Sequence, residues 1–111
     1  MLRIAAILLV STLPIAAFAQ DTGRSTGFEV ATLAEGLNHP WGIAPLPDGS
    51  MLVTERRGRL LHVAADGMVG KPINGVPEVD AKGQGGLLDI TLHPNFGENR
   101  LVYLSFAEPG E

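Results

Sequence analysis

The amino-acid sequence predicts an all-β fold, and three observations support this prediction. Apolar segments of four to six residues recur along the chain, bounded by Gly, Pro, Asp or Asn. No segment has the 3.6-residue apolar period of a convincing helix. Two longer segments, WGIAPLPDGSMLVTE and LLDITLHPNFGENRLVYLSF, share an apolar strand, a proline-containing turn and a second strand, with Pro47 and Pro94 offset by 47 residues.

The spacing of these two segments bears on the architecture. Offsets of about 40 to 50 residues between units of several antiparallel strands are typical of β-propeller blades. The pattern alone does not choose between a propeller and a β-sandwich. A propeller needs about four blades or more to close its ring, and this chain has room for about two.

The first strands are predicted from alternation and from short apolar runs. Residues 28–33 alternate, with Val30 flanked by polar or small neighbours, and residues 41–46 form an apolar run. Pro47-Asp48-Gly49 is a turn by its chemistry and leads into a strand over residues 51–54.

The later strands follow the same logic. Arg57-Gly58 turns the chain into a strand over residues 59–63, and Ala65-Asp66-Gly67 turns it again. The last two predicted strands are residues 87–92 and 101–106, and residues 93–100 join them.

The first nineteen residues have the pattern of a secretory signal peptide. Arg3 precedes the apolar run Ile4 to Val10, and Ala17-Phe18-Ala19 forms an A-x-A cleavage site. The run is shorter than the roughly 20 residues of a spanning helix. We therefore predict a signal peptide over residues 1–19, a flexible leader over 20–27, and a periplasmic or secreted protein without a stable membrane anchor.

The charge balance excludes some classes of partner. Removing residues 1–19, which hold only Arg3 among the charged residues, leaves 7 of the 8 Lys and Arg against all 12 Asp and Glu. This net charge near -5, without a basic run, argues against binding nucleic acid or anionic membranes. The chain has no Cys, so a packed core and not a disulfide must stabilise it.

The loop Gly83-Gln84-Gly85-Gly86 is the strongest candidate for a site. Glycine has no Cβ, so such a loop can adopt positive φ and admit another group close to its backbone. Taken alone, a glycine cluster before a strand is more often a tight turn. The single amide on it, Gln84, could donate and accept hydrogen bonds at once without adding charge.

Three segments of the chain resemble a known family. GLNHPWGIAPLPDGSMLVTERRGRLLHV, GVPEV and GQGGLLDITLHPNFGENRLVYLSF are similar to the start of the soluble, pyrroloquinoline quinone (PQQ)-dependent aldose sugar dehydrogenases, the glucose/sorbosone dehydrogenase family. The resemblance extends from about Phe28 to Glu108. Its densest parts, residues 38–49 and 83–96, keep their order and spacing.

This resemblance implies a six-bladed β-propeller, of which residues 28–111 form about the first two blades. It implies that PQQ lies in a groove on one face with calcium bound against it. An aldose is then oxidised at its anomeric carbon to a lactone: a histidine takes the hydroxyl proton, a hydride passes to the quinone, and calcium polarises the quinone carbonyl. Two electrons leave to an acceptor.

The resemblance assigns only part of this machinery to the present residues. Gln84 matches a glutamine near the sugar and quinone, and Gly85, with its neighbouring glycines, would let the loop approach the cofactor. None of His39, His62 and His93 aligns with the catalytic base, and no pair of them has a metal-ligand spacing. No catalytic residue and no metal ligand is therefore assigned, and the calcium ligands are expected beyond residue 111.

Other polar and aromatic residues have structural interpretations. Asp89 could face the cofactor groove, but a structural hydrogen bond to the neighbouring strand is favoured. Trp41 could stack on the quinone, but a place in the core between blades is favoured. Glu55-Arg56-Arg57 could supply charge to the cofactor face, but the favoured interpretation is a solvated turn. His39 and His93 precede prolines, which favours extended or turn conformations, and His62 is interpreted as a surface or interblade residue.

The resemblance also implies that the family continues through several more blades. We therefore interpret the chain as an N-terminal fragment that is inactive by itself, and assign it the function of the parent protein. The alternatives are a non-enzymatic exported propeller that binds a ligand, since fold does not determine function, and another propeller enzyme such as a lactonase. A histidine base and a calcium loop further along would favour the dehydrogenase.

Overall fold

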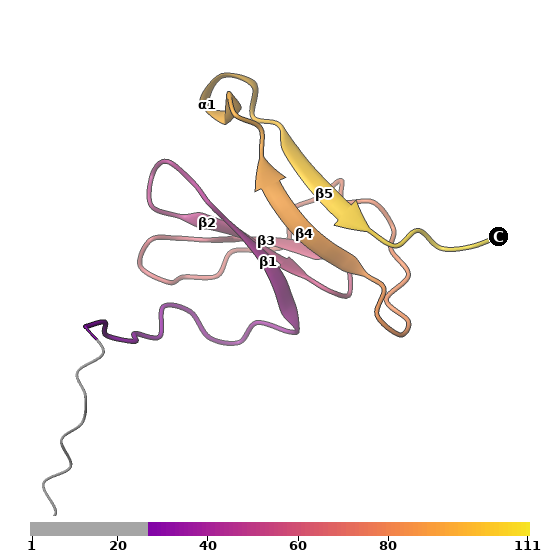
Figure 1. Cartoon of the computed structure of the whole chain (residues 1–111), viewed down its shortest axis with the longest axis horizontal. Helices are drawn as coiled ribbons and strands as arrows, with labels where there is room; N and C mark the ends of the chain where they lie inside the picture. Colours follow the sequence, from indigo (N-terminus) through magenta and orange to yellow (C-terminus); the bar gives the residue numbers. More distant parts are fainter. Residues whose placement is uncertain (1–26) are drawn as a thin grey trace, which may run out of the picture.

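Residues 27–111 are described by the computed structural model, and they form two antiparallel β-sheets and one short helix (Figure 1). The first sheet has the strand order β1-β2-β3, and the second pairs β4 with β5. The predicted signal peptide and all of the predicted leader except Gly27 lie outside the described residues. The elements are β1 (Pro40–Pro45), β2 (Met51–Glu55), β3 (Arg59–Val63), β4 (Leu87–Leu92), α1 (Phe96–Asn99) and β5 (Val102–Phe106).

Turn chemistry produces the first sheet as predicted. The β1–β2 turn closes with hydrogen bonds from Leu46 N to Ser50 O (2.8 Å) and from Gly49 N to Leu46 O (3.1 Å). The β2–β3 turn closes from Gly58 N to Glu55 O (2.9 Å). Strands of five or six residues joined by turns this tight have few alternative registers, so the hairpin order follows the chain.

The 47-residue offset is a structural repeat. Strand β4 begins and ends 47 residues after β1. Each of these strands also carries a bulge at the same place: β1 shifts register between Pro40 and Ile43, and β4 between Leu87 and Ile90. The similarity noticed around the two prolines therefore reflects two hairpins of the same construction.

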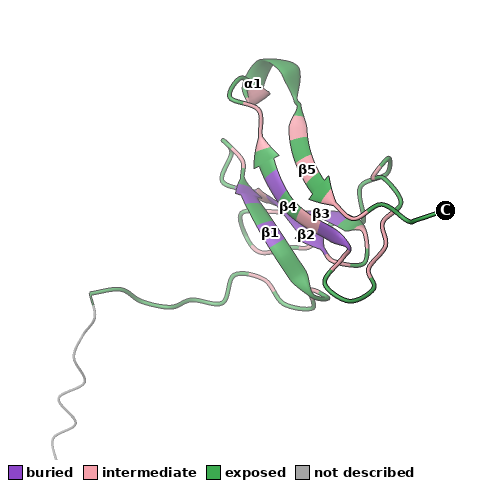
Figure 2. Ribbon diagram, turned by 45° about the vertical axis from the view of Figure 1, so that its right-hand side comes forward, coloured by how far each residue is buried: buried purple, intermediate pink, exposed green. Residues whose placement is uncertain are grey.

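The main buried cluster lies where β4 packs against the first sheet (Figure 2), whereas Val53, Leu61 and Val63 are buried outside this cluster. Burying each large aliphatic side chain contributes about 1.5 to 3 kcal/mol. A polar link supports the contact, because the Thr54 hydroxyl accepts from Gly42 N (2.9 Å) and donates to Leu88 O (2.5 Å). The buried cluster comprises Ala44, Leu52, Leu60 and Ile90.

Two predicted elements differ from the structure. Residues 28–33 form no strand, and Phe28 and Val30 are 78% and 92% exposed, because no strand of the described residues pairs with them. The connection between β4 and β5 contains the one-turn helix α1, whereas the sequence predicted no helix there. A four-residue helix is too short to leave an apolar period in the sequence.

The predicted core position of Trp41 is wrong for the described residues. Gly42 and Ala44 are the buried residues of β1, and Trp41 points to the opposite face, where it is 57% exposed. Within residues 27–111, no helix has the length and apolar character that crossing a membrane requires.

Candidate functional site

The glycine loop precedes β4 and lies beside the β2–β3 turn (Figure 1). Gly83 and Gln84 form the tip of the loop, which is closed by a hydrogen bond from Gly85 N to Lys82 O (2.9 Å). The Asp80 carboxylate accepts from Lys82 N (3.0 Å) and fixes the start of the loop. The loop is therefore a defined turn in front of the strand, as its composition predicted.

The Arg56 side chain holds this loop. Its Nε donates to Gly85 O (3.1 Å), and its Nη2 donates to Ala81 O (2.9 Å) and Gly83 O (2.6 Å). The Arg56 backbone adds a fourth link, because its carbonyl accepts from Leu87 N (2.9 Å). One residue of the β2–β3 turn thus joins the loop along its whole length.

Two of the loop glycines are required by close packing. A Cβ on Gly86, whose φ is 120°, would overlap the Arg56 carbonyl oxygen. A Cβ on Gly85 would overlap Asp80 O and lie 3.1 Å from Lys82 O. Gly83, in contrast, has open space where its Cβ would lie. The predicted role of Gly85 in binding stays a prediction, beside this packing role.

Gln84 is exposed at the tip of the loop. The hydrogen bonds that hold the loop run through backbone carbonyls, Asp80 and Arg56, and none of them uses the Gln84 amide. The amide therefore keeps its donor and acceptor capacity for a molecule outside the described residues.

A polar hollow of about 160 Å³ lies beside the loop, lined by His39, Arg56, Arg57 and Ala81. Arg56 N donates to His39 O (3.1 Å), so the segment before β1 belongs to the same site. His39 has a φ of 48°, in the left-handed region. Of the extended and turn conformations predicted for it, the extended one is therefore wrong. Two arginines without an acidic residue in the lining make this hollow suitable for an anionic group.

Glu55 and Arg56 do not form the solvated turn favoured from the sequence. The Glu55 side chain is 1% exposed, accepts from Asn38 N (2.7 Å) and forms a salt bridge with Arg59. These bonds compensate the cost of burying the carboxylate. The bond from Asn38 N to Glu55 also fixes the segment that carries His39. Within that segment, Asn38 Oδ1 contacts His39 Nδ1 at 2.6 Å. Of the three charged residues, only Arg57 is exposed.

His93 has a structural role in the described residues. Its Nδ1 accepts from Asn95 N and Asn99 Nδ2, both at 2.9 Å, and it caps the turn before α1. The centroid of its ring lies 5.9 Å from the centroid of the Tyr103 ring. With the Nδ1 lone pair shared in this way, His93 is poorly placed to act as a base at that atom.

His62 also belongs to a structural network. Its Nε2 lies 2.9 Å from Ser50 Oγ, and the Ser50 hydroxyl donates to Asp48 Oδ1 (2.5 Å). The Ser50 hydroxyl and then its backbone N–H lower the pKa of the Asp48 carboxyl below its ordinary value of 3.8. This network lies in the first hairpin and fixes the β1–β2 turn.

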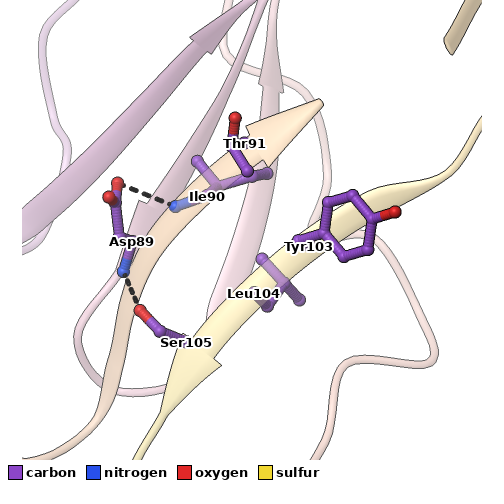
Figure 3. A pocket seen from close by; sticks show the side chains of 6 residues that line it. All are labelled: Asp89, Ile90, Thr91, Tyr103, Leu104 and Ser105. Carbon is purple, nitrogen blue, oxygen red and sulfur yellow. Dashed lines mark hydrogen bonds between the residues drawn. The ribbon is translucent and has the colours of Figure 1, made fainter. Parts of the chain in front are cut away.

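Asp89 bonds within its own strand, which corrects the prediction of a side-chain bond to the neighbouring strand. Its Oδ1 accepts from Ile90 N (2.9 Å), and the link to β5 is made by Asp89 N, which donates to Ser105 Oγ (3.0 Å) (Figure 3). The bulge in β4 separates these groups from the regular ladder. Asp89 lines an open pocket of about 190 Å³ along β4 and β5, together with Thr91 and Tyr103.

Within residues 27–111, no group of three or more His, Cys, Asp and Glu side chains could hold a metal ion. The candidate site is the glycine loop, with Gln84 exposed at its tip and two arginines lining the hollow beside it.

The family model for glucose/sorbosone dehydrogenases matches residues 37–111. The chain belongs to the glucose/sorbosone dehydrogenase family. The aldose sugar dehydrogenase YliI of Escherichia coli (strain K12) is 47% identical over 83 residues, which cover 74% of this chain and 22% of that protein. Quinoprotein glucose dehydrogenase B of Acinetobacter calcoaceticus is 35% identical over 85 residues, covering 74% of this chain and 18% of the relative.

Solved structures show the same similarity. A structure described as a glucose dehydrogenase is 52% identical, with a TM-score of 0.70, over 73% of this chain and 26% of that one. The PQQ-bound form of aldose sugar dehydrogenase from Streptomyces coelicolor is 39% identical, with a TM-score of 0.68, over 74% of this chain and 25% of that one.

These neighbours are β-propellers, which confirms the predicted fold class for the part of them that the chain covers. The two hairpins related by 47 residues are thus parts of propeller blades and not of a sandwich. The chain spans about a quarter or less of the length of the curated relatives it matches.

Proposed function

We propose that the protein to which this chain contributes is a PQQ-dependent dehydrogenase that oxidises aldose sugars at the anomeric carbon to lactones. Family membership and the quinoprotein relatives support the proposal. The observation that carries it is the exposed Gln84 amide, presented on a glycine loop whose backbone is held by Arg56.

The residues at the loop fit a flat, anionic cofactor such as PQQ. Open space beside Gly83 leaves the loop backbone accessible to a planar ring. Arg56 and Arg57 line the adjacent hollow and could balance the carboxylates of the quinone. When bound, the quinone supplies the acceptor for the hydride.

Gln84 would orient a sugar hydroxyl or a quinone oxygen. A primary amide offers two donors and one acceptor group, so it can bind an oxygen that donates in one state and accepts in another. Because the amide is neutral, it would position the reactants without changing the charge of the site. One such hydrogen bond contributes about 0.5 to 1.5 kcal/mol.

Calcium is also part of the proposal, with most of its ligands supplied from beyond residue 111; residues 27–111 hold no group of three or more His, Cys, Asp and Glu side chains that could bind it. We further propose export to the periplasm, directed by residues 1–19, and transfer of the two electrons to an external acceptor. The acidic net charge of the chain is consistent with a partner other than nucleic acid.

The test is Gln84→Ala in the protein produced from its own gene and loaded with PQQ. Removing the amide costs about 0.5 to 3 kcal/mol, depending on whether a buried partner is left without a hydrogen bond. The value of kcat/KM for the aldose should therefore fall by about 2-fold to 100-fold. The free energy of unfolding should stay the same, because no bond that holds the loop uses this side chain.

Asn74→Ala is the matched control, since it removes another exposed amide from a turn. Wild-type kinetics for Gln84→Ala would show that the loop is only a turn, and loss of folding would show that Gln84 is structural. If the wild-type protein bound sugar but showed no quinone-dependent turnover, the result would instead support an exported propeller that binds a ligand without catalysis.

A further inference from the structure

We propose that Arg56 is a positioning residue for the reaction: its guanidinium clamps the loop of residues 81–86 so that Gln84 is presented in one conformation. The inference rests on the proposed function, since it requires that Gln84 contact the sugar or the quinone. Nothing in it requires Arg56 to touch either molecule.

The clamp brackets Gln84. The three carbonyls bound by the guanidinium belong to alternate residues, Ala81, Gly83 and Gly85, so bound peptide groups lie on both sides of the glutamine. Fixing the peptide groups on both sides restricts the backbone of Gln84 and hence the direction of its side chain. The bond to Gly83 O, at 2.6 Å, has the short length of a charge-assisted hydrogen bond.

A glycine loop needs such a clamp more than other loops do. Glycine loses more conformational freedom on ordering than any other residue, and this loop has three glycines around one functional side chain. If the loop populated several conformations, the apparent affinity of the site would fall by the fraction of time spent in the competent one. The arginine supplies the order that the loop sequence lacks.

The position of Arg56 is itself well determined. Its backbone N–H donates to His39 O (3.1 Å) and its carbonyl accepts from Leu87 N (2.9 Å), so segments on both sides hold its Cα. Close packing against Gly86 adds a steric restraint. The side chain therefore reaches the loop from a rigid base.

Arginine is suited to this task in a way that lysine is not. Its planar guanidinium carries five donors in a rigid fork, whereas a lysine ammonium is a point charge on a flexible stem. A lysine ammonium is a single nitrogen, so Arg56→Lys cannot reproduce the two-nitrogen fork that binds Gly85 O through Nε and the carbonyls of Ala81 and Gly83 through Nη2. Arg57, which is exposed and lines the same hollow, provides a neighbouring arginine outside the clamp.

The test compares Arg56→Lys and Arg56→Met with the charge-conserving control Arg57→Lys in the PQQ-loaded protein produced from its own gene. Hydrogen exchange of the Gly85 and Leu87 amides, which donate to Lys82 O and Arg56 O, should accelerate by about tenfold or more in the Arg56 variants and change less than about twofold in Arg57→Lys. Arg56→Lys keeps the charge, so it tests the clamp even if Arg56→Met fails to fold.

Kinetics then separate positioning from a general effect on folding. Arg56→Lys should lower kcat/KM for the aldose by a factor no larger than that of Gln84→Ala. In the Gln84→Ala background, Arg56→Lys should cause little further loss, because the side chain that it positions is already absent.

Each contrary outcome refutes a different step. Unchanged exchange of the loop amides in Arg56→Lys would refute the clamp, whatever the function of the loop. Independent, multiplicative losses in the double variant would refute positioning of Gln84 and leave the proposed function intact. Wild-type kinetics for Gln84→Ala would refute the proposed contact, and the positioning role with it.

Discussion

Replacing Gly86 by alanine should be among the most damaging single-methyl changes in this part of the protein. The residue has a φ of 120°, a conformation that residues with a side chain rarely adopt. The added Cβ would overlap the Arg56 carbonyl oxygen and lie 3.1 Å from the carbonyl carbon. That oxygen accepts from Leu87 N at 2.9 Å, so relief of the overlap would also disturb the entry into β4.

The magnitude follows from these two effects. Backbone strain of this kind costs about 1 to 3 kcal/mol. Weakening one backbone hydrogen bond adds about 0.5 to 1.5 kcal/mol. We therefore expect Gly86→Ala to lower the free energy of unfolding by about 1.5 to 4.5 kcal/mol, a large part of the roughly 5 to 15 kcal/mol typical of a domain.

Denaturant unfolding of the protein produced from its own gene measures this loss, as a lower midpoint at constant slope. Gly83→Ala is the matched control, because Gly83 also has a positive φ, 57°, but no atom lies within 4 Å of its Cβ position. That variant should lose only about 1 to 2 kcal/mol. Equal losses in the two variants would refute the close approach of the loop to Arg56.

Signal-peptide cleavage and two further substitutions have defined outcomes. The exported protein should begin at Gln20, and an intact mass that still includes Met1 would contradict cleavage after Ala19. The stability advantage of the wild type over Asp48→Asn, measured by denaturant unfolding, should be complete above pH 3.8 and disappear as the pH falls through the lowered pKa of Asp48; an advantage independent of pH would contradict it. Gly42→Ala should lower the free energy of unfolding by about 1 to 3 kcal/mol, since its Cβ would lie 3.0 Å from Asp89 Oδ1 and 3.1 Å from Ile90 N; an unchanged denaturant midpoint would show that the contact relaxes freely.

Local sequence patterns predicted the strands that pair within the described residues. Apolar runs bounded by Gly, Pro and Asp turns correspond to β1 through β5, because hairpin formation depends on neighbours in the sequence. The alternation around Val30 failed as a predictor, since a strand also needs a pairing edge, and that edge is a property of the whole fold. Within the described residues, the predicted burial of Trp41 failed for a related reason, because alternation does not say which face of β1 the second sheet covers.

The site was predicted only in part. The Gly83-Gln84-Gly85-Gly86 loop is visible in the sequence because its composition is unusual. Arg56 is not, since nothing in the sequence separates it from the adjacent Arg57. The two arginines differ in three dimensions, where 25 to 29 residues of chain separate Arg56 from the carbonyls that it binds.

The place where the 47-residue repeat breaks down explains why an aspartate interrupts an apolar strand. Gly42 and Asp89 are equivalent positions of the two hairpins, each within a bulge, and these bulges face each other. A Cβ on Gly42 would lie 3.0 Å from Asp89 Oδ1, so only one of the two positions has room for a side chain. Asp89 occupies that room and binds Ile90 N, while Gly42 N donates to the Thr54 hydroxyl that links the sheets. Stacking of two similar hairpins therefore requires different residues at their point of contact, and the carboxylate at that point needs no ligand to account for it.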